Sequence, residues 1–308
     1  MSHIPVLYEQ SLEGLGIKPD GIYVDCTLGR GGHSLGILAH LTTGRLIGID
    51  QDSQAIEEAG RIMNAYADKI TLVHDNFRNI KTILQALSIE KVDGILMDLG
   101  VSSPQFDDPQ RGFSYRHEAR LDMRMDRRQA LDAYTVVNTY PYERLVQIMV
   151  SYGEEPHAKQ IARVIEKQRL NTPIETTLQL VDIIKSALPN KVLAQKGHPA
   201  KQVFQALRIE VNQELSILEG TLKDCISLLN QDGRIAVITF HSLEDRIVKK
   251  VFAACSKIEV PSKLPVIGSP KADFELIDKK HSRASQQELQ DNPRAHSAKL
   301  RILRKVSA

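Results

Sequence analysis

The sequence predicts an α/β fold in which an open, mainly parallel sheet is interrupted by a helical insertion. Over residues 1–100, short apolar runs alternate with amphipathic runs of helical period, which is typical of β–α units with right-handed crossovers. Residues 105–212 contain almost no strand-like run, and strand character returns at residues 233–240. One discontinuous α/β domain with an inserted helical domain explains this order.

The first part alternates strands and helices along the chain. Ser53 is expected to cap its helix because a serine at this position can bond the free N–H groups of the first turn. We expect strands at residues 22–25, 45–50, 70–74 and 92–98, and helices at residues 34–41, 53–67 and 79–87.

The predicted insertion spans residues 107–212, and the α/β domain comprises residues 1–106 and 213–308. Residues 257–295 carry four prolines and little periodicity, so we expect a long irregular segment there, partly ordered over the sheet edge. Helices are expected at residues 142–152, 158–169, 176–187, from about 200, and at 244–254, and a last strand at 298–304.

Composition limits the class of protein. The 308 residues are 42% hydrophobic and 25% charged, typical of a globular protein, and the net charge of +2 restricts any basic surface to a local patch. No apolar run reaches the ~18 residues of a membrane span, and the first residues do not resemble a signal peptide. Three widely spaced cysteines predict neither a disulfide framework nor a metal site, and indicate a reducing cytoplasm.

A glycine-rich turn follows the first predicted strand, in residues 23–33 (YVDCTLGRGGH), and Asp50 ends the second. Such a turn cradles a nucleotide, and an acid at Asp50 can accept hydrogen bonds from ribose hydroxyls. The third glycine of a dinucleotide fingerprint would fall at Ser34. Because a ligand without a pyrophosphate does not need that glycine, the turn favours S-adenosylmethionine over a nicotinamide dinucleotide.

Other strand ends complete the predicted pocket. Asp25 could counter the ammonium group of the ligand, and residues 75–77 (DNF) would flank the adenine, with Phe77 as an apolar wall. The alternative is a set of ordinary strand-end turns without a cofactor. We favour the cofactor because ligand-type residues follow consecutive strands.

The stretch after the fourth strand, residues 98–106 (DLGVSSPQF), is where methyltransferases of this architecture place the acceptor. The tetrapeptide at 103–106 resembles the motif of amino-methylating enzymes, with Gln105 in place of the second proline. Ser103 could hold the N–H groups of a base amine, and Phe106 could stack on an extruded base. An ordinary Ser-Pro turn is the equally weighted alternative.

Several long strings together resemble the bacterial small-subunit ribosomal RNA (cytidine-N4) methyltransferases, the RsmH or MraW family. The resemblance covers essentially the whole chain. It rests on DCTLGRGGH, IDQD, DGILMDLGVSSPQF, RGFSY, LDMRMD, YGEE, HPA, FQALRIEVN, FHSLEDRIV and NPRA.

This resemblance implies a Rossmann-like S-adenosylmethionine-dependent methyltransferase that modifies N4 of one decoding-centre cytidine in 16S rRNA. The expected partner is 16S rRNA within an assembled or late-assembly small ribosomal subunit. For Gln105 it implies a cofactor contact rather than a base contact, which leaves Ser103 and Phe106 as catalytic candidates on the base side. The implied cofactor-binding residues are Gly31, Gly32, His33, Asp50, Phe77, Asp98 and Gln105.

Residues 111–128 interleave arginines with Phe113 and Tyr115, a combination that suits RNA phosphates and bases. Three acids in the same stretch make internal ion pairing the alternative. With the family resemblance, we expect a loop that touches both RNA and protein, and the insertion becomes a candidate RNA-recognition domain.

Residues 240–246 (FHSLEDR) end a strand and open a helix, and Ser242 with Asp245 is expected to form a capping box. His241 is a candidate proton acceptor, although a plain strand-end role is preferred. We expect a helix to start at residues 198–201 and Arg208 to face the substrate. No clustered His and Cys ligands are present, so no metal is expected.

Other functions remain as alternatives. Cytosine C5 methylation needs a cysteine nucleophile, and no cysteine directly follows the fourth predicted strand or a proline. A methyltransferase acting on another nucleobase amine, a nicotinamide-dependent oxidoreductase and a non-catalytic RNA-binding protein would each use the same sheet.

Overall fold

A computed structural model describes residues 5–257, 272–277 and 282–306. The chain forms two compact units. Unit 1 comprises Met1–Gly100 and Leu215–Ala308, and unit 2 comprises Val101–Glu214. The first boundary follows Gly100 rather than residue 106, because Val101 and Phe106 pack against the hydrophobic core of unit 2.

Unit 1 is built on a seven-stranded sheet of order β3-β2-β1-β4-β5-β7-β6. Strands β1 to β5 are parallel neighbours, whereas β7 runs antiparallel to both β5 and β6. The order reverses between β1 and β4, where a doubly wound sheet opens a crevice at its carboxyl edge. The strands are β1 Ile22–Asp25, β2 Arg45–Asp50, β3 Ile70–His74, β4 Val92–Asp98, β5 Leu229–Thr239, β6 Phe274–Leu276 and β7 Lys299–Lys305.

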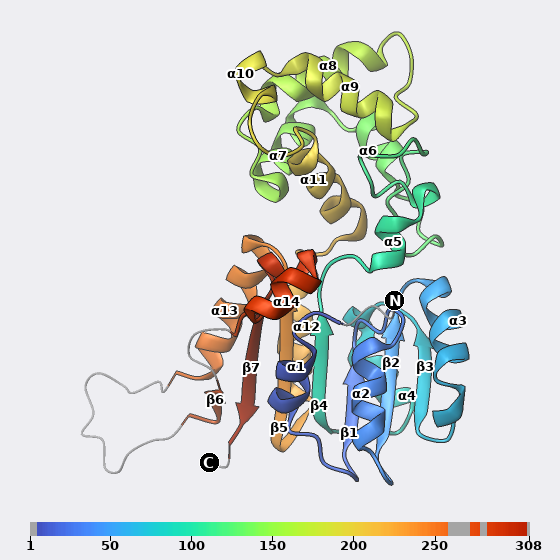
Figure 1. Cartoon of the computed structure of the whole chain (residues 1–308), viewed down its shortest axis with the longest axis vertical. Helices are drawn as coiled ribbons and strands as arrows, with labels where there is room; N and C mark the ends of the chain where they lie inside the picture. Colours follow the sequence, from blue (N-terminus) through green and yellow to red (C-terminus); the bar gives the residue numbers. More distant parts are fainter. Residues whose placement is uncertain (1–4, 258–271, 278–281, 307–308) are drawn as a thin grey trace, which may run out of the picture. The chain divides into compact units, whose positions relative to one another are not determined.

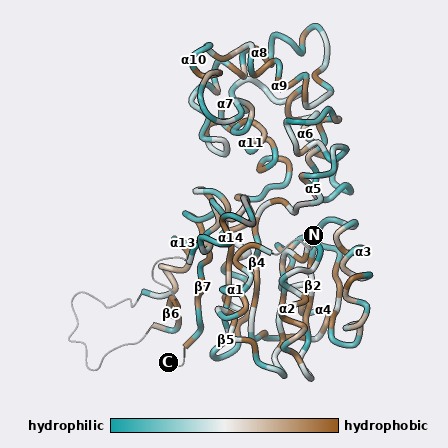
Figure 2. Tube along the Cα trace, in the orientation of Figure 1, coloured by the Kyte–Doolittle hydropathy of each residue, from teal (hydrophilic) through white to brown (hydrophobic). Residues whose placement is uncertain are grey.

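Two hydrophobic clusters cover the two faces of the sheet, because successive strand side chains point to opposite faces. Tyr23 joins one cluster and Val24 the other, and Leu46 and Ile47 divide in the same way. The central strands are hydrophobic along most of their length (Figure 2). One face packs α1 Tyr8–Leu15, α2 Gly32–His40 and α3 Ser53–Ile62, and the other packs α4 Ile80–Ala86, α12 Leu218–Ser227 and α13 Ser242–Cys255.

Unit 2 is helical (Figure 1). It has a hydrophobic core of its own. Neighbouring helices supply its buried side chains at helical spacing, as Ile161 and Ile165 do on α8. Its helices are α5 Ser103–Asp107, α6 Ala133–Thr139, α7 Tyr142–Gly153, α8 Ala158–Arg169, α9 Thr177–Ala187, α10 Asn190–Leu193 and α11 Lys201–Asn212.

The predicted α/β fold class is confirmed, and several local predictions were wrong. Asp52, not Ser53, caps α3, because its side chain accepts the Gln54 N–H. The expected irregular segment contains β6 and α14 Gln286–Asp291, while its residues 258–271 and 278–281 lie outside the described residues. Within the described part of the chain, no helix combines the length and the apolar character needed to cross a membrane.

Candidate active site

The glycine turn joins the end of β1 to the start of α2. Gly29 (φ +51°) and Gly31 (φ +77°) both have left-handed backbone, which favours glycine. A Cβ on Gly31 would lie 2.7 Å from the Met63 methyl group, and one on Gly32 would lie 2.5 Å from Pro5. The missing side chains at Gly31 and Gly32 therefore allow close packing within the protein, and their expected contacts with the cofactor stay predictions.

Asp50 fastens this turn to the end of β2. Its two carboxylate oxygens accept the N–H groups of Gly29 (2.8 Å) and Asp52 (2.9 Å). Burial raises the pKa of Asp50 to about 6, against the lowering effect of these two bonds. Each carboxylate oxygen can accept a further hydrogen bond, so the group can also receive two vicinal hydroxyls.

Asp98 ends β4 at the point where the strand order reverses. Its Oδ1 atom is buried and has no hydrogen-bond partner among the described residues. Its Oδ2 atom lies 3.7 Å from Nδ1 of His33. Burial, reinforced by the charges of Asp25 and Glu244, raises the pKa of Asp98 to about 8. An orphaned acceptor at this strand end indicates a missing donor or cation.

His33 lies in the first turn of α2 and is 5% exposed. Its Nε2 atom is 3.1 Å from the carbonyl oxygen of Val6. Burial lowers the pKa of His33 to about 4, so the ring is neutral at physiological pH. Since the Val6 carbonyl needs a donor, we assign the proton to Nε2, which leaves the Nδ1 lone pair toward Asp98.

Asp25 does not have the role expected for it. Its carboxylate is 1% exposed and accepts bonds from Ser34 Oγ (2.7 Å) and the Thr27 N–H (3.1 Å). It therefore stabilises the turn internally and cannot counter an ammonium group of a ligand. Thr27, which the sequence analysis missed, also accepts the Asp98 N–H at 2.6 Å and so ties β4 to the turn.

The loop after β3 is held by its own side chains. Asp75 Oδ1 accepts the Asn76 N–H and an amide N–H of Asn79, and Asn76 caps the short 3₁₀ turn Phe77–Asn79. Phe77 is partly buried against the hydrophobic cluster of unit 1. This arrangement fixes an aromatic ring at the carboxyl edge, next to the strand that carries Asp50.

Comparison with known proteins decides the family. Residues 1–306 match the family model of the MraW methylases. The chain belongs to the MraW methylase family. It is 53% identical over 308 residues to the ribosomal RNA small subunit methyltransferase H of Streptococcus dysgalactiae subsp. equisimilis, covering 99% of this chain and 98% of that protein. The predicted family membership is confirmed.

Solved structures match across nearly the whole chain at lower similarity. An rRNA methylase from Streptococcus thermophilus is 12% identical with a TM-score of 0.43, covering 99% of this chain and 100% of that one. A SAM-dependent O-methyltransferase from Thermotoga maritima is 9% identical with a TM-score of 0.42, covering 99% and 68%. Membership of the MraW family follows from the family model and the curated relative.

His241 caps α13 in this MraW family member, which replaces the expected Ser242 and Asp245 capping box. Its ring accepts the Glu244 N–H, and Glu244 Oε2 accepts the N–H groups of Phe240 (2.8 Å) and His241 (3.3 Å). The second ring nitrogen is 3.1 Å from Glu244 Oε1. Nε2 forms no hydrogen bond among the described residues, so a role of His241 as proton acceptor stays a prediction beside its role as helix cap.

Asp245 has a different task from the one expected. Its two oxygens accept bonds from Arg301 (2.7 Å) and Lys299 (2.8 Å) of β7. These bonds lower the pKa of Asp245 despite its burial. The ion pairs join α13 to the last strand of the sheet.

Three predicted site residues lie in α5 of unit 2. Gln105 is buried and forms a capping box with Ser102, whose N–H donates to Gln105 Oε1 at 3.0 Å. Phe106 packs partly buried against the core of unit 2. Ser103 is the first residue of the helix. Their roles toward cofactor or base stay predictions.

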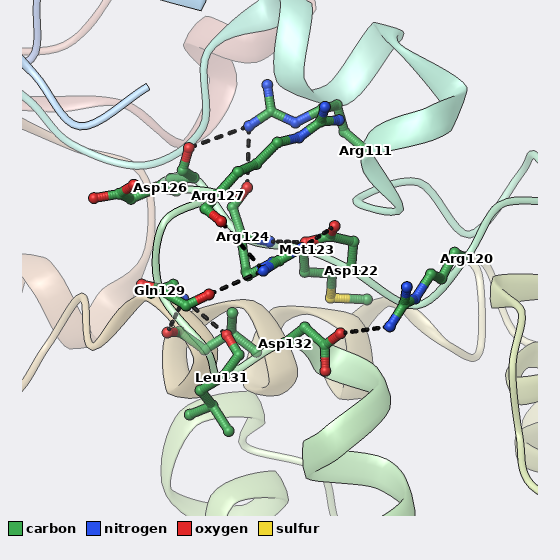
Figure 3. Close-up of polar contacts among 12 residues, drawn as sticks. Arg111, Arg120, Asp122, Met123, Arg124, Asp126, Arg127, Gln129, Leu131 and Asp132 are labelled. Carbon is green, nitrogen blue, oxygen red and sulfur yellow. Dashed lines mark hydrogen bonds and ion pairs between the residues drawn. The ribbon is translucent and has the colours of Figure 1, made fainter. Parts of the chain in front are cut away.

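Most arginines of the 111–128 segment make internal contacts (Figure 3). Arg124 forms a bidentate pair with Asp122, at 2.8 and 2.9 Å, and Arg128 forms one with Asp126. Arg111 is 2% exposed and donates to the carbonyl oxygens of Arg124 (3.0 Å) and Met125 (3.3 Å). Internal ion pairing, the alternative reading of this segment, therefore accounts for much of its charge.

Arg208 forms an ion pair inside unit 2, and its expected contact with the substrate stays a prediction. Both its Nε and Nη2 atoms donate to Glu214, at 2.8 and 2.9 Å. The helix predicted at residues 198–201 begins at Lys201. Among the described residues, no group of three His, Cys, Asp or Glu side chains is arranged to hold a metal ion.

Proposed function

We propose that this chain is an S-adenosylmethionine-dependent methyltransferase that modifies N4 of a cytidine in small-subunit ribosomal RNA. The observation that carries the proposal is the pair of strand-end carboxylates, Asp50 and Asp98, on either side of the glycine turn. Membership of the MraW methylase family and the similarity to the ribosomal RNA small subunit methyltransferase H of Streptococcus dysgalactiae support the reaction and the RNA class.

The residues present suit this cofactor. Asp50 has acceptor capacity for the two ribose hydroxyls, and Phe77 offers an aromatic wall for the adenine. The unpaired Oδ1 atom of Asp98 suits a cationic or N–H-bearing group. When bound, S-adenosylmethionine supplies an electrophilic methyl group on a sulfonium.

The chain's own contribution to such a reaction is positioning and charge. The exocyclic N4 amine of cytosine is a weak nucleophile because its lone pair is conjugated with the base ring. Acceptors that hold its N–H groups would direct that lone pair at the methyl group, and the gain comes from orientation. Ser103 and Phe106 remain our candidates for the base side.

The cysteines argue against the C5 alternative. Cys26 and Cys225 are buried in the core of unit 1. A hydrogen bond with Cys225, together with burial, raises the pKa of the Cys26 thiol, and burial raises that of Cys255. A nucleophilic cysteine needs a lowered pKa and access to its substrate. Replacing Cys26 with alanine should therefore leave methylation largely intact.

Nucleoside mass spectrometry of 16S rRNA tests the proposal. A strain that lacks this gene should lose N4-methylcytidine, and rescue should succeed with the wild-type chain and fail with Asp98→Asn. Unchanged N4-methylcytidine would refute the assignment, and loss of a different methylated base would favour the alternative amine acceptor. Calorimetry with S-adenosylmethionine and with NAD separates a methyltransferase from an oxidoreductase or a cofactor-free RNA-binding protein.

A further inference from the structure

A stacked pair of rings lies on unit 2, formed by side chains that are far apart in the sequence. Tyr115 and His198 stack with centroids 4.2 Å apart and an interplanar angle of 15°. Phe204 of α11 supports Tyr115 from the side in an edge-on contact at 5.8 Å and 89°. Tyr115 and His198 are both partly exposed. Phe204 therefore anchors the stacked pair in the core of unit 2, while part of the surface of the Tyr115 and His198 rings faces solvent.

The charges around this pair are positive. Burial lowers the pKa of His198, and the positive charges of Lys185 and Arg116 lower it further. Both cations are exposed, and Lys185 has only a loose ion pair, 3.8 Å, with the exposed Asp182.

Arg116 differs from three other arginines of its segment. Arg120, Arg124 and Arg128 each pair with an aspartate. Arg116 forms no ion pair among the described residues, and it directly follows Tyr115. Internal pairing thus neutralises most of the segment and leaves one exposed cation beside the stacked rings. Further exposed lysines lie on both sides of His198 along the chain, at Lys191, Lys196 and Lys201.

We propose that the Tyr115–His198 stack, with Arg116 and Lys185, is a contact surface for single-stranded RNA. An unpaired base would extend the stack, and the two cations would meet the adjacent phosphates. This inference rests on the proposed function for the class of nucleic acid. It adds His198 and Lys185 to Tyr115 and Arg116, which lie in the segment expected to contact RNA, and so defines one surface.

Fluorescence anisotropy with a short unstructured RNA and the corresponding blunt duplex tests this surface, using the full chain without methyl donor. His198→Ala should weaken binding of the single strand by at least about fivefold, since a base stack contributes ~1–3 kcal/mol. His198→Phe, which keeps a ring, should bind within about twofold of wild type by the same reasoning. Duplex binding should change little in both variants.

Salt dependence tests the two cations separately. Arg116→Gln and Lys185→Gln should each reduce the slope of log affinity against log salt by about 0.7, the value for one phosphate contact on a single strand. Lys167→Gln, which removes an exposed cation from α8 of the same unit, is the matched control and should keep the wild-type slope. Thermal unfolding of each variant confirms that the fold is retained.

The outcomes separate this inference from the proposed function. Wild-type affinity of His198→Ala for the single strand, equal losses on strand and duplex, or no single-strand binding by the wild-type chain would each overturn it. Binding with the expected pattern but no methyl transfer to 16S rRNA would refute the proposed function and leave the RNA surface standing.

Discussion

His33 links the Val6 carbonyl oxygen, 3.1 Å from Nε2, to the Asp98 carboxyl group, 3.7 Å from Nδ1. The neutral ring thus presents a lone pair to an acid whose pKa is raised to about 8. Because Asp98 is buried beside a neutral ring, its protonated form is favoured. A positively charged ligand would stabilise the ionised form instead. The pair therefore couples ligand charge to proton release.

We expect the affinity for S-adenosylmethionine to rise with pH between about 6 and 8. A cationic ligand stabilises the ionised form of Asp98, so binding releases a proton below its pKa, and affinity gains up to about tenfold per pH unit. Calorimetry in buffers of different ionisation enthalpy measures that proton directly. Asp98→Asn should abolish the dependence in the upper half of this range, and a flat wild-type profile would contradict the coupling.

Asp98→Asn should also stabilise the protein at pH 8. The pKa of Asp98 is higher in the folded state than in the unfolded one, so the folded state holds more protons between pH about 4 and 8. Stability is therefore lost as pH rises through this window, and removing the acid restores at least about 1 kcal/mol.

Thermal unfolding of matched variants checks the direction of this change in stability. Asp122→Asn is the control, because hydrogen bonds from Arg124 lower the pKa of Asp122 despite its partial burial. That variant should be less stable than wild type at neutral pH. A destabilised Asp98→Asn at pH 8 would contradict the prediction.

Asp50→Ala should weaken S-adenosylmethionine binding by more than about tenfold. The variant loses the acceptor for the ribose hydroxyls and also leaves the Gly29 N–H without its partner. An unpaired buried donor costs ~1–3 kcal/mol. Calorimetry gives the affinity. Glu57→Ala removes an exposed ion pair with Arg61 on α3 and should leave the affinity unchanged. Equal affinities for both variants would exclude Asp50 from the site.

Variants at His241 distinguish a helix cap from a proton acceptor. His241→Asn keeps a good N-cap and should retain both stability and methylation, whereas His241→Ala should lose about 1 kcal/mol of stability. Single-turnover rates and thermal midpoints provide the two readings. Loss of methylation in a stable His241→Asn variant would restore the catalytic role.

The sequence predicts elements best where periodicity is local. The bounds of β4 and α8 agree with those expected, because each has an unbroken pattern of its own. β6 is three residues long and is defined only by its pairing with β7, so its own sequence has no pattern that predicts a strand. Capping was misassigned at α3 and α13, where an aspartate and a histidine one residue earlier compete successfully for the same N–H groups.

The site was predictable as a set of residue types at strand ends, and less so in its roles. Asp50 and Asp98 lie at the carboxyl edge as expected. Asp25 has the same chemistry but is enclosed by Thr27 and Ser34, which only the folded turn reveals. The Tyr115 and His198 contact depends on tertiary packing between distant segments, and the sequence analysis treated the two separately.

The place of β7 has a consequence for synthesis on the ribosome. This strand, Lys299–Lys305, lies between β5 and β6 in the sheet although it ends the described chain. Unit 2 is continuous and is complete once Glu214 has been made, so it can fold while translation continues. Unit 1 must wait for its last strand, so a nascent chain can complete this sheet only after Lys305 has been made.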